Sequence, residues 1–400
     1  MSNFIKSHRK FIALSAGIIS IGLTLYATDS RAQEIGITDT EILIGQTGPM
    51  SGPNYMFGTL ALQGAEMIFT EVNTKGGIHG RKIRFVNEDD RCAPEGAVSS
   101  VRRLISEHKA FIIHGGACSN ATLAVVGAVR EAGIPFIAYS AAHNDITGTD
   151  KPTVFRSGLS ARYEGRSQAV FAASIPNVKR VAIVAQHDAW GQAKYVALKE
   201  AAKELGLEIV ADEEMTVDSN DATAQVLAIN KANPDAIITV LYPKPSTVFI
   251  RDAHSYGLTK KPLIGQLAIS DPIDLASKVQ LPGALDNFYT ISLSKFSPSQ
   301  DEAADLRARF SKYASAVQLS QYTLWGIGSA EIIVEALERA GRNLTRKAFM
   351  DALYDSKGFD TSIYPDRILF TTADRDGNKS GTFIQLVDDK IKFIGPKFAK

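Results

Sequence analysis

Reactive residues and catalytic motifs are scarce in this chain of 400 residues. It has two cysteines and seven histidines, and no pair of them has the spacing of metal ligands. The phosphate-binding motif GxxxxGKS/T, the hydrolase motif GxSxG and the metalloprotease motif HExxH are missing. We therefore expect no enzymatic activity, no cofactor and no metal site.

Only one long hydrophobic run occurs, and it lies at the N-terminus. The basic stretch Lys6–Lys10 precedes the apolar run Phe11–Ala27, and Ser30–Ala32 offers small residues at the positions that signal peptidase reads. This pattern predicts a signal peptide over residues 1–32, cleaved near Ala32, and an exported mature chain. The cleavage point has no cysteine, so we expect no lipid anchor. An uncleaved membrane anchor is the alternative, although the run is short for a membrane span.

Strong net charge is also absent. Removing the predicted signal peptide takes away four cations and one anion, so the formal charge changes from +1 to about −2. No basic run and no mixture of basic and aromatic residues remains, which argues against nucleic acid as a partner. Cleavage after residue 32 of 400 leaves 368 residues, more than one hydrophobic core usually holds, so we expect two lobes.

The two cysteines, Cys92 and Cys118, both lie in the exported part. An oxidising compartment favours a disulfide between them. Closing a loop of about 25 residues would stabilise the fold by roughly 3 kcal/mol. Two free buried thiols are the alternative.

Strand patterns alternate with helix patterns along most of the chain. This alternation is typical of parallel sheets with helices on both faces, so we predict an α/β protein with two doubly wound lobes joined by a multi-strand hinge. A helical block follows residue 298, in which Gly326 is expected to serve helix packing, and the tail has a hairpin pattern. The predicted lobes are residues 33–157 plus 289–362 and residues 158–288 plus 363–400.

One stretch, Phe111–His143, has the pattern of an anion site. It contains a buried strand, a glycine turn, a helix with Ser119 as the expected N-cap, and a second strand. Unpaired N–H groups at a helix start bind anions, and open α/β folds bind ligands at the carboxyl ends of strands. The stretch predicts a cradle for a small carboxylate, although most such caps bind nothing. The cradle would be completed by Ser140, Ala141, Ala142 and His143.

Aromatic residues occupy other strand-end loops. Phe57 follows the first strand, and Trp190 and Tyr242 follow strands of the second lobe. Loops of this kind from two lobes can line a cleft that encloses a ligand when the lobes close. Packing of these rings in the lobe cores is the alternative.

An ordered series of short motifs resembles the periplasmic solute-binding proteins of the branched-chain amino acid type, which feed ABC transporters. The resemblance implies the type I periplasmic-binding fold, a periplasmic location and a monomer. It also implies a small-molecule ligand and a membrane permease and ATPase as partners. The series covers the mature chain and comprises Ile44–Gly52, Glu71–Arg81, Asp89–Cys92, Gly115–Ser119 and Gly133–Ala141.

The resemblance also implies which residues contact the ligand. The family holds the ligand carboxylate at the positions of Ser119 and the loop 140–143, and we add the neighbouring Asn120 to the predicted ligand contacts. Cys92 and Cys118 match the family's disulfide. The family's aromatic positions correspond to Phe57, Trp190, Tyr242 and Tyr322.

The chain departs from the family pattern at one position. Amino acid binders of the family have an acidic residue near Gly265 that pairs with the ligand ammonium, and this chain has Gln266 there, which we also predict to contact the ligand. Burying an ammonium without a partner costs several kcal/mol, although Asp188 or Asp271 could substitute. We therefore predict an importer component that captures an aromatic or other non-amino carboxylic acid by hinge closure. A branched-chain or other amino acid or amide binder is the first alternative, and a ligand-sensing receptor module is the second.

Overall fold

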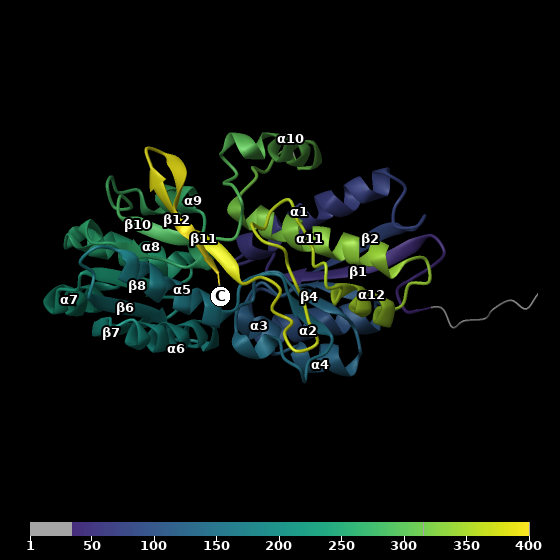
Figure 1. The fold of residues 1–400 in the computed structure, drawn as a ribbon, viewed down its shortest axis with the longest axis horizontal. Coiled ribbons are helices and arrows are strands. Elements are labelled where there is room, and N and C mark those ends of the chain that lie inside the picture. Colours follow the sequence, from purple (N-terminus) through teal and green to yellow (C-terminus); the bar gives the residue numbers. More distant parts are fainter. Residues whose placement is uncertain (1–33, 315, 400) are drawn as a thin grey trace, which may run out of the picture. The chain divides into compact units, whose positions relative to one another are not determined.

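The computed structural model describes residues 34–399 except residue 315, and the predicted signal peptide lies outside this range. The described chain forms two β-sheets with helices packed around them (Figure 1). Within it, no helix has both the length and the apolar composition needed to cross a bilayer.

The first sheet has five parallel strands in the order β2-β1-β3-β4-β5. Seven of the eight residues of β1 are buried, as expected for a strand with helices on both faces. The strands are β1 (Glu41–Gly48), β2 (Lys82–Asp89), β3 (Ile112–Gly115), β4 (Phe136–Ala138) and β5 (Val154–Arg156).

Helices from both ends of the chain cover this first sheet. A Cβ atom at Gly326 would lie 1.6 Å from the Ala61 carbonyl oxygen, and one at Gly64 would lie 2.3 Å from the Thr323 carbonyl oxygen. Only glycine therefore permits the close contact between α1 and α11, which confirms the packing role expected of Gly326. The helices are α1 (Met56–Thr74), α2 (Pro94–Ser106), α3 (Ser119–Leu123), α4 (Val126–Glu131), α10 (Ala304–Tyr313), α11 (Gln321–Ala340) and α12 (Arg346–Leu353).

The second sheet has the order β12-β11-β10-β9-β8-β6-β7. Strands β6 to β10 are parallel, whereas β11 pairs antiparallel with β10 and with β12. The prediction of two doubly wound lobes is confirmed, with the correction that the C-terminal hairpin makes this sheet mixed. The strands are β6 (Arg180–Gln186), β7 (Glu208–Met215), β8 (Ala236–Val240), β9 (Leu263–Ile264), β10 (Phe288–Ser292), β11 (Ser380–Val387) and β12 (Lys390–Ala399).

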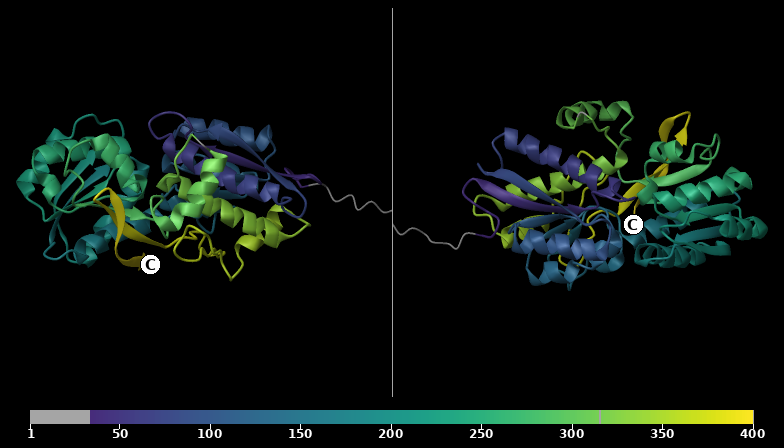
Figure 2. Two further views of the ribbon diagram at one scale, coloured as in Figure 1. Left: turned by 90° about the horizontal axis from the view of Figure 1, so that it is seen from above. Right: turned by 180° about the vertical axis from the view of Figure 1, so that it is seen from behind.

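Five helices pack around the second sheet, and the hairpin of β11 and β12 (yellow) lies at its edge (Figure 2). Asp388 and Asp389 form the hairpin turn with φ angles of 51° and 59°, a region that aspartate tolerates better than most residues. The helices are α5 (Ala161–Ser174), α6 (Ala189–Glu204), α7 (Thr223–Ala232), α8 (Pro243–Ser255) and α9 (Pro272–Val279).

Three segments connect the two sheets: residues 157–160, residues 293–303 and residues 371–379. The third lies beside β5, because the Arg156 amide donates to the Arg375 carbonyl and the Gly377 amide donates to the Arg156 carbonyl. These crossings form the expected multi-strand hinge. The residue boundaries given above for the two lobes remain a prediction.

A disulfide joins Cys92, after β2, to Cys118, before α3. The two Cα atoms are 5.4 Å apart, and 26 positions separate the two residues in the sequence. The bond therefore ties two loops at the carboxyl edge of the first sheet.

Replacing both cysteines by serine is expected to lower the free energy of unfolding by about 3 kcal/mol, because the unfolded chain gains the entropy of an open loop. Urea denaturation of the two proteins measures the difference. Dithiothreitol should destabilise the parent by a similar amount and leave the double variant unchanged. Equal stability of parent and variant would contradict this expectation.

Two adjacent acidic residues near the disulfide have pKa values shifted in opposite directions. Burial, reinforced by the charge of Asp89, raises the pKa of Asp90 from 3.8 to about 6. Asp89 is also partly buried, but its pKa is lowered, because the Met50 amide, the Ser51 hydroxyl and the Arg91 amide donate to its carboxylate. Compared with the unfolded chain, the native state therefore favours the protonated form of Asp90 and the ionised form of Asp89.

Asp90→Asn is expected to stabilise the protein at pH 8 by about 1–3 kcal/mol, because the native state no longer buries that charge. The stabilising effect of a protonated Asp90 is fully present below its unfolded pKa of 3.8 and is lost as the pH rises through about 6. The advantage of the variant should therefore disappear near pH 4. Urea denaturation at both pH values measures it.

Asp89→Asn is the matched control, because the pKa of Asp89 is shifted in the opposite direction to that of Asp90. It should destabilise the protein at pH 8, and the deficit should shrink as the pH falls through the lowered pKa of Asp89. Two variants with the same sign at pH 8 would refute the assignment.

Candidate functional site

A small cavity lies where loops and helices of the two lobes meet. Its volume is about 10 Å³, which is roughly the room for one water molecule. A solute larger than water therefore requires the surrounding groups to separate. The lining residues are Phe57, Ala117, Ser140, Glu164, Trp190, Lys194, Tyr242, Leu267, Ala268 and Trp325.

Aromatic rings from both lobes contact each other at this cavity. The Phe57 ring centroid lies 5.5 Å from that of Tyr242, 5.5 Å from that of Tyr322 and 6.1 Å from that of Trp325. The Trp190 and Tyr242 centroids are 4.2 Å apart. Phe57, Tyr322 and Trp325 belong to helices that cover the first sheet, whereas Trp190 and Tyr242 follow strands of the second. The cluster is therefore an apolar contact between the lobes.

A buried ion pair lies beside these rings. Lys194 Nζ is 2.6 Å from Glu164 Oε2, and each side chain is 1% exposed. Lys194 Nζ also donates to Gln266 Oε1 at 3.2 Å and lies 4.2 Å from the centroid of the Trp190 ring. Burial lowers the pKa of Lys194, and the Glu164 carboxylate acts in the opposite direction.

The close packing of α5 and α6 brings this pair together. A Cβ atom at Gly165 would lie 2.4 Å from the Lys194 carbonyl oxygen and 2.9 Å from the Leu198 amide nitrogen. Glycine therefore lets the two helices approach closely enough for Glu164 on α5 to reach Lys194 on α6.

Ser119 organises the loop that ends β4. Its Oγ accepts hydrogen bonds from the amides of Ala142, at 3.0 Å, and His143, at 3.1 Å. The expectation that Ser119 is a helix N-cap is wrong, because Cys118 occupies that position and α3 begins at Ser119. Its hydroxyl oxygen instead satisfies two amide groups of the loop, so these amides are not free donors.

The charged groups behind this loop are also engaged. Arg156 Nη1 donates to the carbonyl oxygens of Ala141, at 3.0 Å, and His143, at 2.9 Å. Its Nε and Nη2 donate to Asp376 Oδ1 at 2.9 and 2.6 Å. Burial lowers the pKa of His143, although Asp145 acts in the opposite direction.

Hydrogen bonds also connect the lobes around the cavity. Asn120 Nδ2 donates to Asp188 Oδ2 at 3.2 Å, and the Tyr322 hydroxyl donates to the Ala268 carbonyl at 3.2 Å. Asp188 caps α6 through the Gly191 amide at 2.8 Å. These bonds and the aromatic contacts hold the edges of the two sheets together at one place.

Comparison with known proteins identifies the family of this chain. A family model described as a periplasmic binding protein matches residues 41–390. The chain belongs to the periplasmic binding protein family. This confirms the resemblance seen in the sequence, and it agrees with a solute-binding rather than an enzymatic protein. Proteins of this family serve ABC transporters as solute-binding components and are exported to the periplasm.

Two relatives are amino acid binders by name. An amino acid binding protein of Pseudomonas aeruginosa is 27% identical over 310 residues, which cover 77% of this chain and 81% of the relative. A Leu/Ile/Val-binding protein of Rhizobium johnstonii is 25% identical over 327 residues, which cover 82% and 87%. They support the branched-chain amino acid type of the family.

Two solved structures share the fold. A fatty acid ABC transporter substrate-binding protein from Thermomonospora curvata superposes with a TM-score of 0.82 at 23% identity, covering 93% of this chain and 96% of the other. An ABC transporter solute-binding protein from R. palustris in complex with 4-hydroxybenzoate has a TM-score of 0.78 at 21% identity, covering 90% and 97%. At these identities the likeness establishes the fold alone.

In this periplasmic binding protein, the predicted ligand residues fall into two groups. Phe57, Ser140, Trp190 and Tyr242 line the cavity, and Tyr322 and Gln266 contact lining residues. Ser119, Ala141 and Ala142 are almost fully buried behind the cavity wall, next to His143, and Asn120 forms the cross-lobe bond to Asp188. Whether these residues touch solute remains a prediction.

Sequence reasoning missed Glu164, Lys194 and Trp325. Lys194 lies four residues after Trp190 on one helix, so the spacing alone places the two on the same face. Trp325 lies three residues after Tyr322 on another helix, so these two side chains also share one helix face. No local signal identifies Glu164, because its position depends on the packing of α5 against α6.

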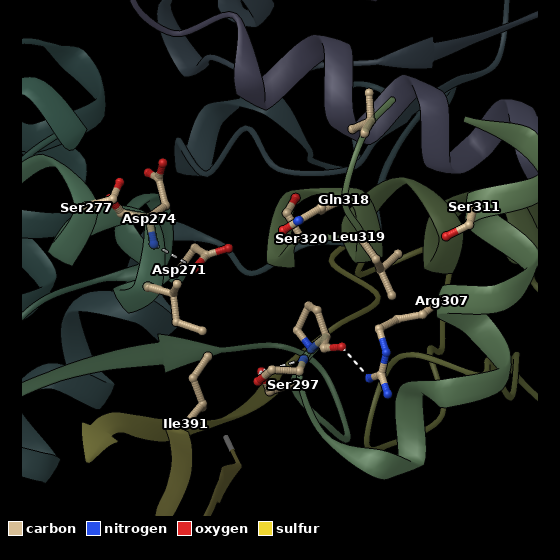
Figure 3. Close-up of a pocket in the computed structure, with 14 residues that line it drawn as sticks. Asp271, Asp274, Ser277, Ser297, Arg307, Ser311, Gln318, Leu319, Ser320 and Ile391 are labelled. Carbon is tan, nitrogen blue, oxygen red and sulfur yellow. Dashed lines mark hydrogen bonds between the residues drawn. The ribbon is translucent and has the colours of Figure 1, made fainter. Parts of the chain in front are cut away.

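The two aspartates named as substitutes for the missing acid differ in position. Asp188 lies beside the cavity, whereas Asp271 caps α9 and lines a separate pocket of about 550 Å³. Figure 3 shows Asp271, Asp274 and Ser277 on one side of that pocket and Leu319, Ser320 and Arg307 on the other. No group of His, Cys, Asp and Glu among the described residues could hold a metal ion.

Ser119→Ala is expected to lower the free energy of unfolding by about 1–3 kcal/mol, because the buried Ala142 amide and the partly buried His143 amide lose their acceptor. Ser140→Ala is the matched control, since the Ser140 hydroxyl makes no hydrogen bond within the described residues, and it should change stability by less than about 0.5 kcal/mol. Chemical denaturation of both variants measures the difference, and equal losses would show that Ser119 does not hold the loop.

Proposed function

We propose that this periplasmic binding protein captures a small carboxylic acid with an aromatic or other apolar body and no amino group, and delivers it to the permease of an ABC importer. The proposal depends mainly on the cluster of Phe57, Trp190, Tyr242, Tyr322 and Trp325 between the lobes. A flat apolar solute can replace ring contacts of this kind with ring contacts of its own.

The aromatic cluster gives the solute a favourable environment. Each well-placed aromatic pair contributes about 1 kcal/mol beyond the burial of its surface. When the lobes separate, Phe57 moves away from Tyr242 and the rings of each lobe become accessible. A solute that contacts both sets of rings then favours the closed arrangement, because it binds that arrangement better than the open one.

A polar group at the cavity suits the carboxylate of such a solute. The Ser140 hydroxyl lines the cavity at the end of β4 and makes no hydrogen bond within the described residues, so it is available to donate to a carboxylate. A carboxylate between these lobes would accept hydrogen bonds in surroundings from which water is excluded, where they are stronger than in water. The 4-hydroxybenzoate complex of a protein with the same fold supports this class of solute.

A specific observation favours an amino acid as the second candidate. The Glu164 carboxylate lines the cavity, so the cavity wall contains an acid despite Gln266, and two relatives are amino acid binders by name. Lys194 already pairs with this carboxylate at 2.6 Å, however, and a ligand ammonium would have to compete with it. For this reason we favour the acid without an amino group.

Isothermal titration calorimetry of the mature protein, unfolded and refolded to release any co-purified solute, tests the proposal. Benzoate is expected to bind with a stoichiometry of one, and leucine is expected to give no heat. Trp190→Leu should weaken benzoate binding by about 1–2 kcal/mol through the loss of ring contact.

Tyr195→Leu on the same helix is the matched control, because Tyr195 bonds to Asp212 and Lys199 away from the cavity, and it should leave benzoate affinity unchanged. Heat from leucine together with none from benzoate would replace the proposal by the amino acid alternative.

A further inference from the structure

One oxygen of the Glu164 carboxylate has no hydrogen-bond partner. Oε2 accepts from Lys194 Nζ at 2.6 Å and from the Leu267 amide at 3.3 Å. Oε1 is shielded from solvent and has no donor among the described residues. A buried carboxylate oxygen without a donor is costly. Because Glu164 also lines the cavity, a donor on a solute in the cavity would lie next to this carboxylate.

The neighbouring cation does not satisfy this oxygen. Lys194 Nζ donates to Glu164 Oε2 at 2.6 Å and to Gln266 Oε1 at 3.2 Å, and it lies 4.2 Å from the centroid of the Trp190 ring. The orphan oxygen therefore stays available while Lys194 holds its present contacts.

Both carboxylate oxygens of the other acid beside the cavity already accept hydrogen bonds. Asp188 accepts from the Gly191 amide at 2.8 Å, from Gln186 Nε2 at 2.7 Å and from Asn120 Nδ2 at 3.2 Å. Glu164 is therefore the carboxylate with a free acceptor at this cavity, within the part of the chain that the structure describes.

The charge of the pair decides which donor suits Glu164. Lys194 already balances the Glu164 carboxylate, so a second ammonium at Oε1 would lie beside the first one in surroundings that screen charge poorly. A hydroxyl satisfies the oxygen without adding charge. The site is thus built for a neutral donor.

We propose that Glu164 is a specificity-determining residue and that the solute is a hydroxylated carboxylic acid whose hydroxyl group donates to Glu164 Oε1. This inference rests on the proposed function, since it takes the cavity between the lobes as the solute site. The rings supply affinity for the body of the solute, and Glu164 distinguishes the hydroxylated acid from the same acid without the hydroxyl.

Calorimetry with matched acids on the mature protein tests the inference. The probes are benzoate, 3-hydroxybenzoate, 4-hydroxybenzoate, 4-methoxybenzoate and 4-(aminomethyl)benzoate. The tighter of the two hydroxybenzoates is expected to bind at least about 10-fold better than benzoate or the methoxy compound, which lack the donor. The aminomethyl compound, whose donor is cationic, should bind more weakly than this hydroxybenzoate.

A double variant assigns the preference to Glu164. Glu164→Leu with Lys194→Met replaces the buried pair by apolar side chains of similar size, a change that folded proteins often tolerate. Thermal unfolding verifies the fold. The preference for the hydroxylated acid is expected to fall below about 2-fold, while benzoate affinity stays within about 3-fold of the parent.

A surface ion pair on the same two helices supplies the control. Arg166 and Glu204 are 50% and 60% exposed, and Arg166→Met with Glu204→Leu should leave the hydroxyl preference intact.

The outcomes separate this inference from the proposed function. Benzoates that bind without preference for the hydroxyl, or a preference that persists in the double variant, overturn the role of Glu164 and leave the proposed function standing. If the aminomethyl compound binds more tightly than the hydroxybenzoates, Glu164 prefers an ammonium donor, and the assignment of a hydroxyl donor is overturned. Heat from leucine and none from any benzoate overturns both.

Discussion

The first lobe and the hinge both depend on the hydrogen bonds of the Arg156 guanidinium. The side chain is fully buried, and its hydrogen bonds go to Asp376, Thr147 and the carbonyls of Ala141 and His143. A buried guanidinium that loses its partners is strongly destabilising. The tail segment around Asp376 must therefore lie beside β5, and the loop after β4 must lie across it. One side chain thus joins the hinge segment to the loop beside the cavity.

Each lobe has a buried charge pair close to its part of the cavity, but the two pairs differ in how fully they are satisfied. The pair of Arg156 and Asp376 lies behind the loop 140–143 and shapes it. The pair of Lys194 and Glu164 lies in the cavity wall and keeps one acceptor open. The first is suited to holding a backbone in place, and the second is suited to reading a polar group on a solute.

Much of the architecture could be predicted because it depends on local patterns. Alternating strand and helix patterns indicated two parallel sheets, and the tail pattern indicated the hairpin that makes the second sheet mixed. Gly326 was expected to serve helix packing, and its Cβ would overlap with the Ala61 carbonyl. The aromatic residues at strand ends were found together because carboxyl ends of parallel strands meet at one edge.

The rest depended on contacts between distant segments. The pairing of Glu164 with Lys194 arises from the close approach of two helices at Gly165, which no short motif encodes. The hydroxyl oxygen of Ser119 was expected to cap its own helix, yet it accepts from the loop some 23 residues later. The local sequence of a serine at the start of a helix is compatible with either role. Which one it takes depends on where the chain returns after β4.

The direct contact of Phe57 with Tyr242 also bears on how affinity is set. The ring of one lobe and a solute cannot occupy the same face of the partner ring, so closure of the protein on itself competes with capture. The observed dissociation constant is then the intrinsic one divided by the fraction of molecules able to accept a solute. Substitutions that weaken or strengthen this contact can therefore change uptake through that fraction, in addition to any change in the contacts with the solute.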